Sequence, residues 1–186
     1  MASAEAAIER LCDPIHSVSA HYVIAQDGAV TQLVAEGMRA WHAGAGEWQG
    51  QGDVNSRSIG IELDNDGKAP FAEPLMRRLE LLLDEVMTRW EIAADGVIGH
   101  SDLAPGRKGD PGPMFDWARL AQVGLAAPTR GTPWTGPVDM TAFVSAARAA
   151  GYTENAAPEA LLTAVRLRHR PKASGPLTAA DFAPLT

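Results

Sequence analysis

Residues 19–34 read SAHYVIAQDGAVTQLV, and this stretch sets the first part of the fold. Two runs rich in β-branched and aromatic residues flank Asp27-Gly28. An Asp-Gly pair between two such runs is a strong signal for a β-hairpin, because glycine readily adopts the positive φ that tight hairpin turns require. The stretch therefore predicts two antiparallel strands joined by a short turn.

The segments around this hairpin predict helices and further strands. Residues 3–12 predict a short helix, and residues 74–90 predict a longer one because their apolar side chains recur at helical spacing. Alternating isoleucine and leucine predict a strand over residues 58–64. A short strand over residues 96–100 and a helix over residues 114–124 follow.

The composition limits the classes of function. The chain has 186 residues, a net charge of −7 and a single cysteine, so an internal disulfide and a cysteine-rich zinc motif are excluded. We expect Cys12 to be a buried thiol. No basic block suggests a nucleic acid partner, and no apolar run reaches the length of a membrane span. We expect a monomer that is cytoplasmic as written, or periplasmic or outer-membrane-associated if a leader precedes Met1.

The C-terminal part of the sequence differs in composition. Residues 127–139 contain three prolines and two glycines, which is typical of a linker, and two helical patterns follow. We therefore predict a first domain over residues 1–126, a linker over residues 127–138 and a small helical module over residues 139–186. About fifty residues are too few to build a robust core alone, so we expect the module to pack on the first domain.

The chemistry-bearing residues gather first in GHSDLAPGRKGDPG, residues 99–112. His100 and Asp110 carry an imidazole and a carboxylate, which are donors that zinc accepts. A turn-rich segment can fold back and bring both to one point, and Lys108 can then place a cation near them to stabilise an oxyanion. The same letters are also ordinary turn signals, so the spacing alone leaves both interpretations open.

Two other regions hold candidate residues. Glu62 lies in an otherwise apolar strand, where it is either a solvent-facing side chain or a general base. The glycine-rich residues 39–57 predict a long loop, and such loops often line binding sites. Its Trp41 and His42 suit a sugar or peptide ligand, although its aromatic residues could equally anchor the loop. His21 is interpreted as a packed strand histidine.

Four motifs occur in one order: VSAHYVI, RAWHAG, NSRSIGIEL, and GHSDLAPGRKGDPG followed by MFDW. Together they resemble the zinc-dependent N-acetylmuramoyl-L-alanine amidases of the type 2 family over residues 3–125, and residues 139–186 resemble a degenerate helical peptidoglycan-binding module. The resemblance implies an α+β fold, a mixed β-sheet flanked by helices, and hydrolysis of the amide between N-acetylmuramic acid and L-alanine in peptidoglycan or muropeptides. It also implies zinc as cofactor and roles for particular residues: His100 and Asp110 as metal ligands, Glu62 as catalytic acid/base, Lys108 as assisting cation, and Trp41, His42 and Asn55 as substrate-binding residues.

One departure from the family pattern concerns the third zinc ligand. In the family this is a histidine on a strand just before the helix that residues 3–12 match, and the chain begins at Met1, after that position. Three explanations stay open: a longer protein that contains the histidine, a variant that no longer cleaves, or replacement of the ligand by His21 or His42. The second explanation corresponds to a peptidoglycan-binding module of the same fold without catalysis.

Overall fold

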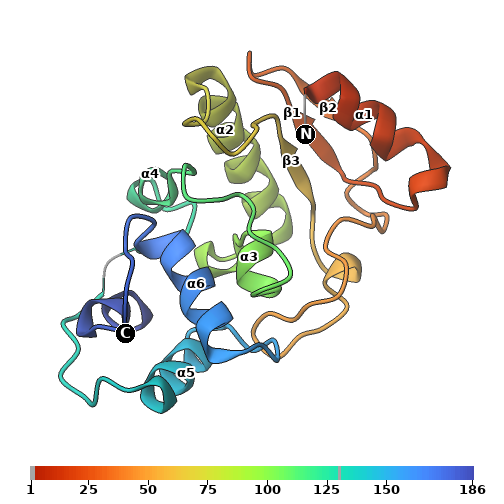
Figure 1. The fold of residues 1–186 in the computed structure, drawn as a ribbon. Helices are drawn as coiled ribbons and strands as arrows, with labels where there is room; N and C mark the ends of the chain where they lie inside the picture. Colours follow the sequence, from red (N-terminus) through yellow and green to blue (C-terminus); the bar gives the residue numbers. More distant parts are fainter. Residues whose placement is uncertain (1–2, 130) are drawn as a thin grey trace. The chain divides into compact units, whose positions relative to one another are not determined.

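The computed structural model describes residues 3–129 and 131–186 (Figure 1). The chain divides into two compact units. The first comprises Met1–Ala45 and Asp53–Ile92, and the second comprises Gly46–Gly52 and Ala93–Thr186. The predicted domain boundaries at residues 126 and 139 stay a prediction.

The first unit contains a three-stranded mixed sheet in the order β2-β1-β3. Strands β1 (Tyr22–Ile24) and β2 (Val30–Gln32) are antiparallel, which confirms the predicted hairpin, and β3 (Ile61–Leu63) pairs with β1 in parallel. The hairpin turn needs glycine at position 28, because Gly28 has a φ of 87° and a Cβ there would lie 2.8 Å from the carbonyl oxygen of Pro74.

Two helices of the first unit contact β1. Helix α1 (Ala4–Cys12) is capped by the Ser3 side chain and packs through small residues against Val23. Because side chains alternate along a strand, the neighbours of Val23 in β1 face the other side of the sheet, where Figure 1 shows helix α2 (Glu73–Trp90). Both helices were predicted. Cys12 is exposed rather than buried, because it is the last residue of α1 and the helix buries Ala4 and Ala7 instead.

The second unit is built from helices and turns. Its core contains Phe143, Tyr152 and Phe182, and the Phe143 and Phe182 rings meet edge to face with centroids 5.6 Å apart. Helix α6 contacts α3, α4 and α5. The α-helices of this unit are α3 (His100–Leu103), α4 (Trp117–Gln122), α5 (Met140–Ala149) and α6 (Pro158–His169).

Short 3-10 turns complete the described secondary structure. Two of them lie in the first unit and three in the second. They are η1 (Pro14–His16), η2 (Val54–Ser56), η3 (Ala94–Gly96), η4 (Ala179–Asp181) and η5 (Ala183–Leu185).

The segment Gly46–Gly52 interrupts the first unit in sequence and belongs to the second. The backbone N–H of Gln49 donates to the carbonyl of Gly151 at 2.9 Å, and that of Gly50 donates to Oγ1 of Thr153 at 2.8 Å. The rings of Trp48 and Tyr152 meet edge to face with centroids 5.0 Å apart. This short segment is therefore held by both backbone hydrogen bonds and aromatic packing.

The strand predicted over residues 96–100 is wrong. Ala94–Gly96 forms η3, and helix α3 begins at His100. The carbonyl of Val97 accepts a hydrogen bond from Nη2 of Arg168 at 3.0 Å, whereas a strand would bond its carbonyls to a neighbouring strand. A side-chain contact has thus taken the place of sheet pairing.

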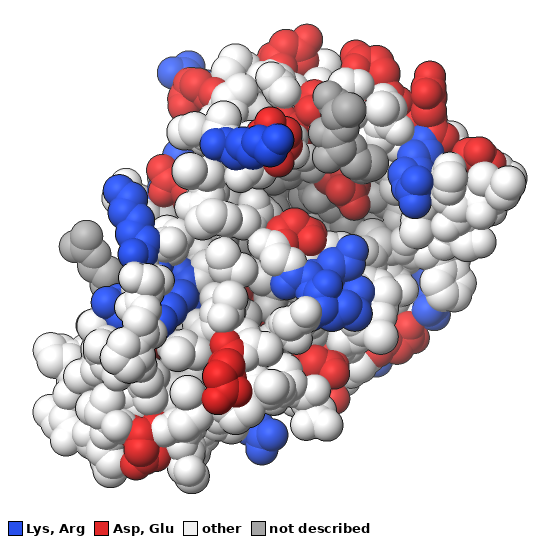
Figure 2. Space-filling model, viewed as in Figure 1, with Lys and Arg blue, Asp and Glu red and all other residues white. Residues whose placement is uncertain are grey.

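The described helices include none that is both long and apolar enough to cross a bilayer. On the face drawn in Figure 2, basic and acidic side chains are interspersed, and no continuous basic patch covers the visible surface.

Candidate functional site

The loop around His100 closes on itself within the second unit. The backbone N–H of Ser101 donates to the carbonyl of Asp110 at 3.0 Å. A Cβ at residue 99 would lie 2.6 Å from Cδ of Pro111, so only glycine permits this close approach. The turn-rich sequence of residues 99–112 therefore brings its two ends together.

This closure places the His100 and Asp110 side chains in contact. Nδ1 of His100 lies 2.6 Å from Oδ2 of Asp110, and Nε2 of His100 is buried without a hydrogen-bond partner in the described structure. Partial desolvation raises the pKa of Asp110, but the hydrogen bond and charge of His100 and the charge of Lys108 bring that pKa below its ordinary value. The carboxylate is therefore held in its ionised form.

Lys108 is exposed in the same loop. Its backbone N–H donates to the carbonyl of Ala104 at 3.0 Å. A pocket of about 310 Å³ is lined by Gly106, Arg107, Lys108, Gly109, Ala160, Thr163, Ala164 and Leu167. The predicted cation thus lies at the rim of a small hollow in the second unit.

Zinc takes imidazole nitrogen and carboxylate oxygen, and catalytic sites use three protein ligands and a water. His100 and Asp110 fit two of these positions, because their donor atoms converge and the carboxylate is ionised. Within residues 3–129 and 131–186, no group of three histidine, cysteine, aspartate or glutamate side chains could hold a metal ion. Among the described residues, His100 and Asp110 therefore match two of the three protein ligands that such a site would use.

Glu62 lies in the first unit, in the middle of β3. It pairs in register with Val23 of β1, and it is half-buried. Paired residues of neighbouring strands project to the same face of a sheet, so Glu62 shares the face of Val23. The sheet thus fixes the backbone position of the predicted acid/base.

The predicted substrate-binding residues also lie in the first unit. Trp41 is 54% exposed, and the guanidinium of Arg39 stacks 4.1 Å from its ring centroid. Oδ1 of Asn55 accepts hydrogen bonds from the backbone N–H groups of His42 and Ala43, at 3.0 and 2.8 Å. Asn55 is buried, so this carbonyl oxygen holds the loop in which Trp41 and His42 lie.

His42 packs closely on the backbone of Gly60. A Cβ at residue 60 would lie 2.3 Å from Cγ of His42, so this contact requires glycine. The His21 ring meets the His42 ring edge to face, with centroids 5.6 Å apart. The position of the His42 ring is thus set by contacts on two sides.

The His21 ring is held by hydrogen bonds at both of its nitrogens. It is fully buried, its Nδ1 accepts from the N–H of Gly60 at 2.9 Å, and its Nε2 lies 3.0 Å from the carbonyl of Met38. Nδ1 is an acceptor and Nε2 must be the donor, so both ring nitrogens are in use. This agrees with the interpretation of His21 as a packed histidine.

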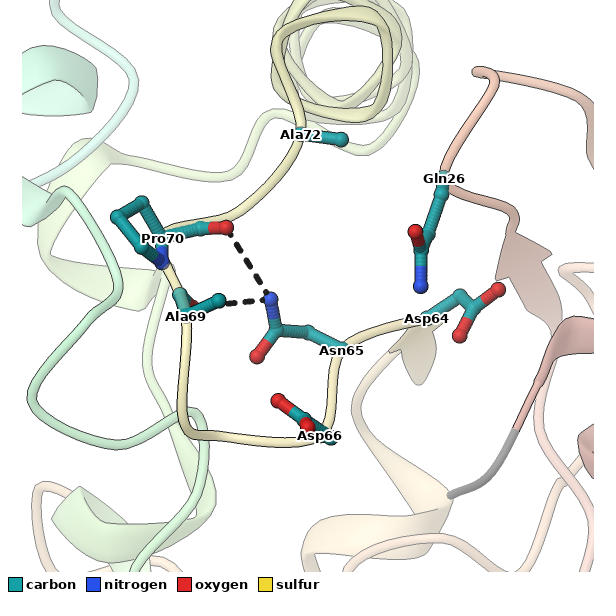
Figure 3. Close-up of a pocket in the computed structure, with 7 residues that line it drawn as sticks. All are labelled: Gln26, Asp64, Asn65, Asp66, Ala69, Pro70 and Ala72. Carbon is teal, nitrogen blue, oxygen red and sulfur yellow. Dashed lines mark hydrogen bonds between the residues drawn. The ribbon is translucent and has the colours of Figure 1, made fainter.

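The first unit also has a pocket of about 260 Å³ (Figure 3), lined by Gln26, Asp64, Asn65, Asp66, Ala69, Pro70 and Ala72. None of the predicted site residues lines it. Nδ2 of Asn65 donates to the carbonyls of Ala69 and Pro70, and Oδ1 of Asp66 accepts from the N–H of Lys68 at 2.9 Å. These polar groups stabilise their own loop.

Sequence reasoning did not single out Asp102, which is fully buried beside the candidate pair. Its Oδ2 accepts from the N–H of Gly99 at 2.8 Å, at the start of α3. An acidic residue in the first turn of a helix is a known signal for such capping, and the letters GHSD contain it.

Comparison with known proteins gives a family match. The model of the N-acetylmuramoyl-L-alanine amidase family (Amidase_2) matches residues 1–113. The chain is 43% identical over 104 residues to the 1,6-anhydro-N-acetylmuramyl-L-alanine amidase AmpD of Enterobacter cloacae, covering 56% of each chain. It is 39% identical over 126 residues to the N-acetylmuramoyl-L-alanine amidase AmiD of Escherichia coli K12, covering 59% of this chain and 46% of AmiD. The chain thus spans about half the length of these curated relatives.

Solved structures extend the likeness to the C-terminal helices. A structure of AmiD from E. coli, in complex with anhydro-N-acetylmuramic acid-L-Ala-D-γ-Glu-L-Lys, has a TM-score of 0.83 at 29% identity and covers 97% of this chain and 81% of that chain. A structure of AmpDh3 from Pseudomonas aeruginosa has a TM-score of 0.84 at 28% identity and covers 97% of this chain and 84% of that chain. The predicted α+β class, with a small mixed sheet and flanking helices, is confirmed.

Proposed function

Because the chain belongs to the N-acetylmuramoyl-L-alanine amidase family, we propose that it hydrolyses the amide bond between N-acetylmuramic acid and L-alanine. The substrate would be peptidoglycan or a muropeptide released from it. The observation that carries the proposal is the likeness, over 97% of this chain, to an AmiD structure that contains an anhydromuramyl peptide. The identity to amidases from two bacteria supports the same reaction.

The proposed cofactor is zinc, with His100 and Asp110 as two of its ligands. Their contact at 2.6 Å and the lowered pKa of Asp110 support this assignment. When bound, zinc would polarise the scissile carbonyl and lower the pKa of a water molecule. A further ligand would complete the usual catalytic set of three.

Glu62 and Lys108 supply the proposed acid–base and charge chemistry. The carboxylate of Glu62 accepts the proton of the attacking water and returns it to the amine of the leaving L-alanine. The ammonium of Lys108 stabilises the negative charge that develops on the carbonyl oxygen. These roles follow from the match of both residues to the family motifs.

Trp41, His42 and Asn55 are the proposed substrate-binding residues. The exposed Trp41 ring offers an apolar face of the kind on which sugars and peptides pack. Asn55 would act by holding the loop, since its Oδ1 is already bonded to the backbone at His42 and Ala43. The three residues therefore contribute contact and loop geometry.

The test uses Glu62→Gln, which keeps the shape of the side chain and removes its basicity. We expect release of the stem peptide from an anhydromuropeptide to fall about 100-fold or more. Zinc content, measured by atomic absorption, should equal that of the parent. Glu9→Gln, an exposed position on α1, is the matched control and should keep full activity. Near-parent turnover in Glu62→Gln would remove the acid/base role from Glu62.

A second candidate is a peptidoglycan-binding protein without catalysis. It is favoured by the absence, within residues 3–129 and 131–186, of a group of three side chains able to hold a metal. Incubation of the parent with zinc and muropeptide separates the two candidates. Binding by calorimetry without release of L-alanyl peptide would support the binding protein, and release would support the amidase.

A further inference from the structure

His100 is positioned by a turn whose geometry depends on Asp102. The N–H of Gly99 donates to Oδ2 of Asp102 at 2.8 Å, and the N–H of Asp102 donates back to the carbonyl of Gly99 at 3.1 Å. Helix α3 has only four residues, so it offers few internal hydrogen bonds to hold His100, its first residue. The capping contacts of Asp102 therefore add to the hydrogen bond from Ser101 to Asp110 in ordering this turn.

Asp102 is in turn held by a residue far along the chain. Nη1 of Arg168, in α6, donates to Oδ2 of Asp102 at 2.7 Å, and its Nη2 donates to the carbonyl of Val97 at 3.0 Å. The hydroxyl of Tyr152 donates to Oδ1 of Asp102 at 3.1 Å. Arg168 thus clamps residues on both sides of Gly99.

The side chains of this clamp are buried, and Arg168 stacks on an aromatic ring. Asp102 is fully buried, and Arg168 is 4% exposed. The guanidinium of Arg168 lies 4.0 Å from the ring centroid of Trp117, and the Trp117 ring also lies 3.3 Å from the position that a Cβ on Gly99 would occupy. Stacking fixes the plane of the guanidinium, so its two hydrogen bonds keep one direction.

We propose that Arg168 is a positioning residue for the candidate metal ligand His100, acting through Asp102 and the carbonyl of Val97. The inference rests on the proposed amidase function. Arg168 lies outside residues 1–113, which the family model matches. The C-terminal helix α6 thereby contributes to the geometry of the site.

The chain contains a matched control for this proposal. Arg166 is also in α6 and also pairs with a fully buried aspartate, at 2.8 Å between its Nη2 and Oδ2 of Asp181. Its hydrogen bonds in the described structure go to Asp181, Gly175 and Pro176. Replacement of either arginine by methionine breaks a buried ion pair in the same helix, but only the Arg168 change reaches the turn.

The first measurement follows the His100 ring in metal-free protein. The Cε1–Hε1 resonance of His100, assigned by its loss in His100→Gln, is recorded by NMR at a temperature where circular dichroism finds all variants folded. We expect it to shift or broaden in Arg168→Met and to stay in place in Arg166→Met. A general loss of stability does not move this resonance in a fully folded sample.

The second measurement is a zinc titration by calorimetry. Loss of an outer contact that orients a ligand typically weakens metal binding 10- to 100-fold, so we expect at least about a tenfold loss in Arg168→Met and no more than about twofold in Arg166→Met. If Arg168→Met does not fold, Arg168→Lys replaces it with the same criteria, because its single ammonium cannot span both acceptors.

An unchanged His100 resonance in the folded Arg168 variant, or equal effects of the two arginine changes, would overturn the inference. The inference and the proposed function fail separately. If the parent binds zinc but releases no peptide, the amidase proposal fails and both measurements still decide the role of Arg168. If the parent binds no zinc, the NMR measurement alone decides it.

Discussion

The two units bury polar groups of different kinds. Among the described residues, the buried polar side chains of the first unit are His21 and Asn55, which bond to the backbone. Those of the second unit include Asp102, Arg168 and Asp181, which bond mainly to one another or to further charged side chains. Among the described residues, the buried polar side chains of the first unit are thus neutral, whereas most of those of the second unit are charged.

This difference matters because neutral and charged buried groups respond differently to change. Loss of a neutral partner leaves one hydrogen-bonding group unsatisfied, which costs about 1–3 kcal/mol. Loss of one member of a buried ion pair leaves a charge in a poor solvent, which costs about 3–5 kcal/mol. We therefore expect the second unit to be more sensitive both to single substitutions and to pH.

The largest effect is expected for Asp181→Ala. Asp181 is fully buried and accepts hydrogen bonds from Arg166, Arg170 and the N–H of Thr178. The change leaves the two arginines without their carboxylate, so the free energy of unfolding should fall by about 3–5 kcal/mol in urea denaturation.

Asp139→Ala is the control for this loss. Asp139 is exposed and caps α5 by accepting from the N–H of Ala142 at 2.9 Å, so its loss should cost about 1 kcal/mol. If Asp181→Ala lowers the free energy of unfolding no more than Asp139→Ala does, the buried charges around Asp181 do not stabilise the protein more than an exposed helix cap.

The next effect is a pH dependence caused by His169. Burial and the nearby charge of Arg168 lower the pKa of His169 from 6.5 to about 3. The unfolded chain then binds one more proton than the folded chain between these pH values, so stability is lost as pH falls from 6.5 toward 3. Linkage gives a contribution of about 3 kcal/mol between pH 7 and pH 4.

In the parent, the free energy of unfolding falls between pH 7 and pH 4. His169→Gln should make this fall smaller by about 3 kcal/mol. The measurement is a set of urea denaturation curves at pH 4, 5, 6 and 7. His16→Gln, at an exposed histidine of the first unit, is the control for removing one imidazole from the chain. Identical pH profiles for His169→Gln and the parent would contradict a buried neutral His169.

A smaller effect is expected for His21→Leu in the first unit. The change leaves the N–H of Gly60 and the carbonyl of Met38 without the partners that His21 provides. The free energy of unfolding at pH 7 should fall by about 2 kcal/mol, less than for Asp181→Ala. A loss as large as that of Asp181→Ala would remove the contrast between the units.

The smallest effect is expected for Tyr22→Phe. The Tyr22 hydroxyl donates to Glu36 at 2.6 Å, and burial together with this bond raises the pKa of Tyr22 to about 12. Glu36 keeps its bonds to Arg89 and Trp90, so the loss should be about 1 kcal/mol at pH 7. Because the folded pKa is raised, the parent's advantage should shrink as pH rises from 10 toward 12, and a loss that grows with pH would contradict this assignment.

Local patterns predicted regular elements in both units, and helices α4, α5 and α6 of the second unit lie within segments that were predicted to be helical. The hairpin around Asp27-Gly28, the strand containing Glu62 and helix α2 all follow from local patterns, because each buries one face in a regular sheet or helix. The strand predicted before His100 failed because Val97 bonds to Arg168 instead. No local pattern can indicate a partner that lies 71 residues away.

The candidate site was predictable only in part, because local patterns do not reveal contacts between residues that are distant in the sequence. The family resemblance implied roles for His100, Asp110, Lys108 and Glu62, and the structure brings His100 and Asp110 into contact. Asp102 was visible only as an acidic residue in a first helical turn. The clamp by Arg168 depends on tertiary packing, so it could be found only in the structure.

The segment Gly46–Gly52 has a consequence for dissecting the molecule. It is threaded into the second unit, although its neighbours on both sides in the sequence belong to the first. A fragment that begins at residue 93 would lack the Trp48 side chain against which Tyr152 packs, so it would expose a gap in its core. Conversely, after a single proteolytic cut between residues 92 and 93, the segment Gly46–Gly52 of the N-terminal fragment would still be packed in the second unit. The two fragments should therefore stay associated.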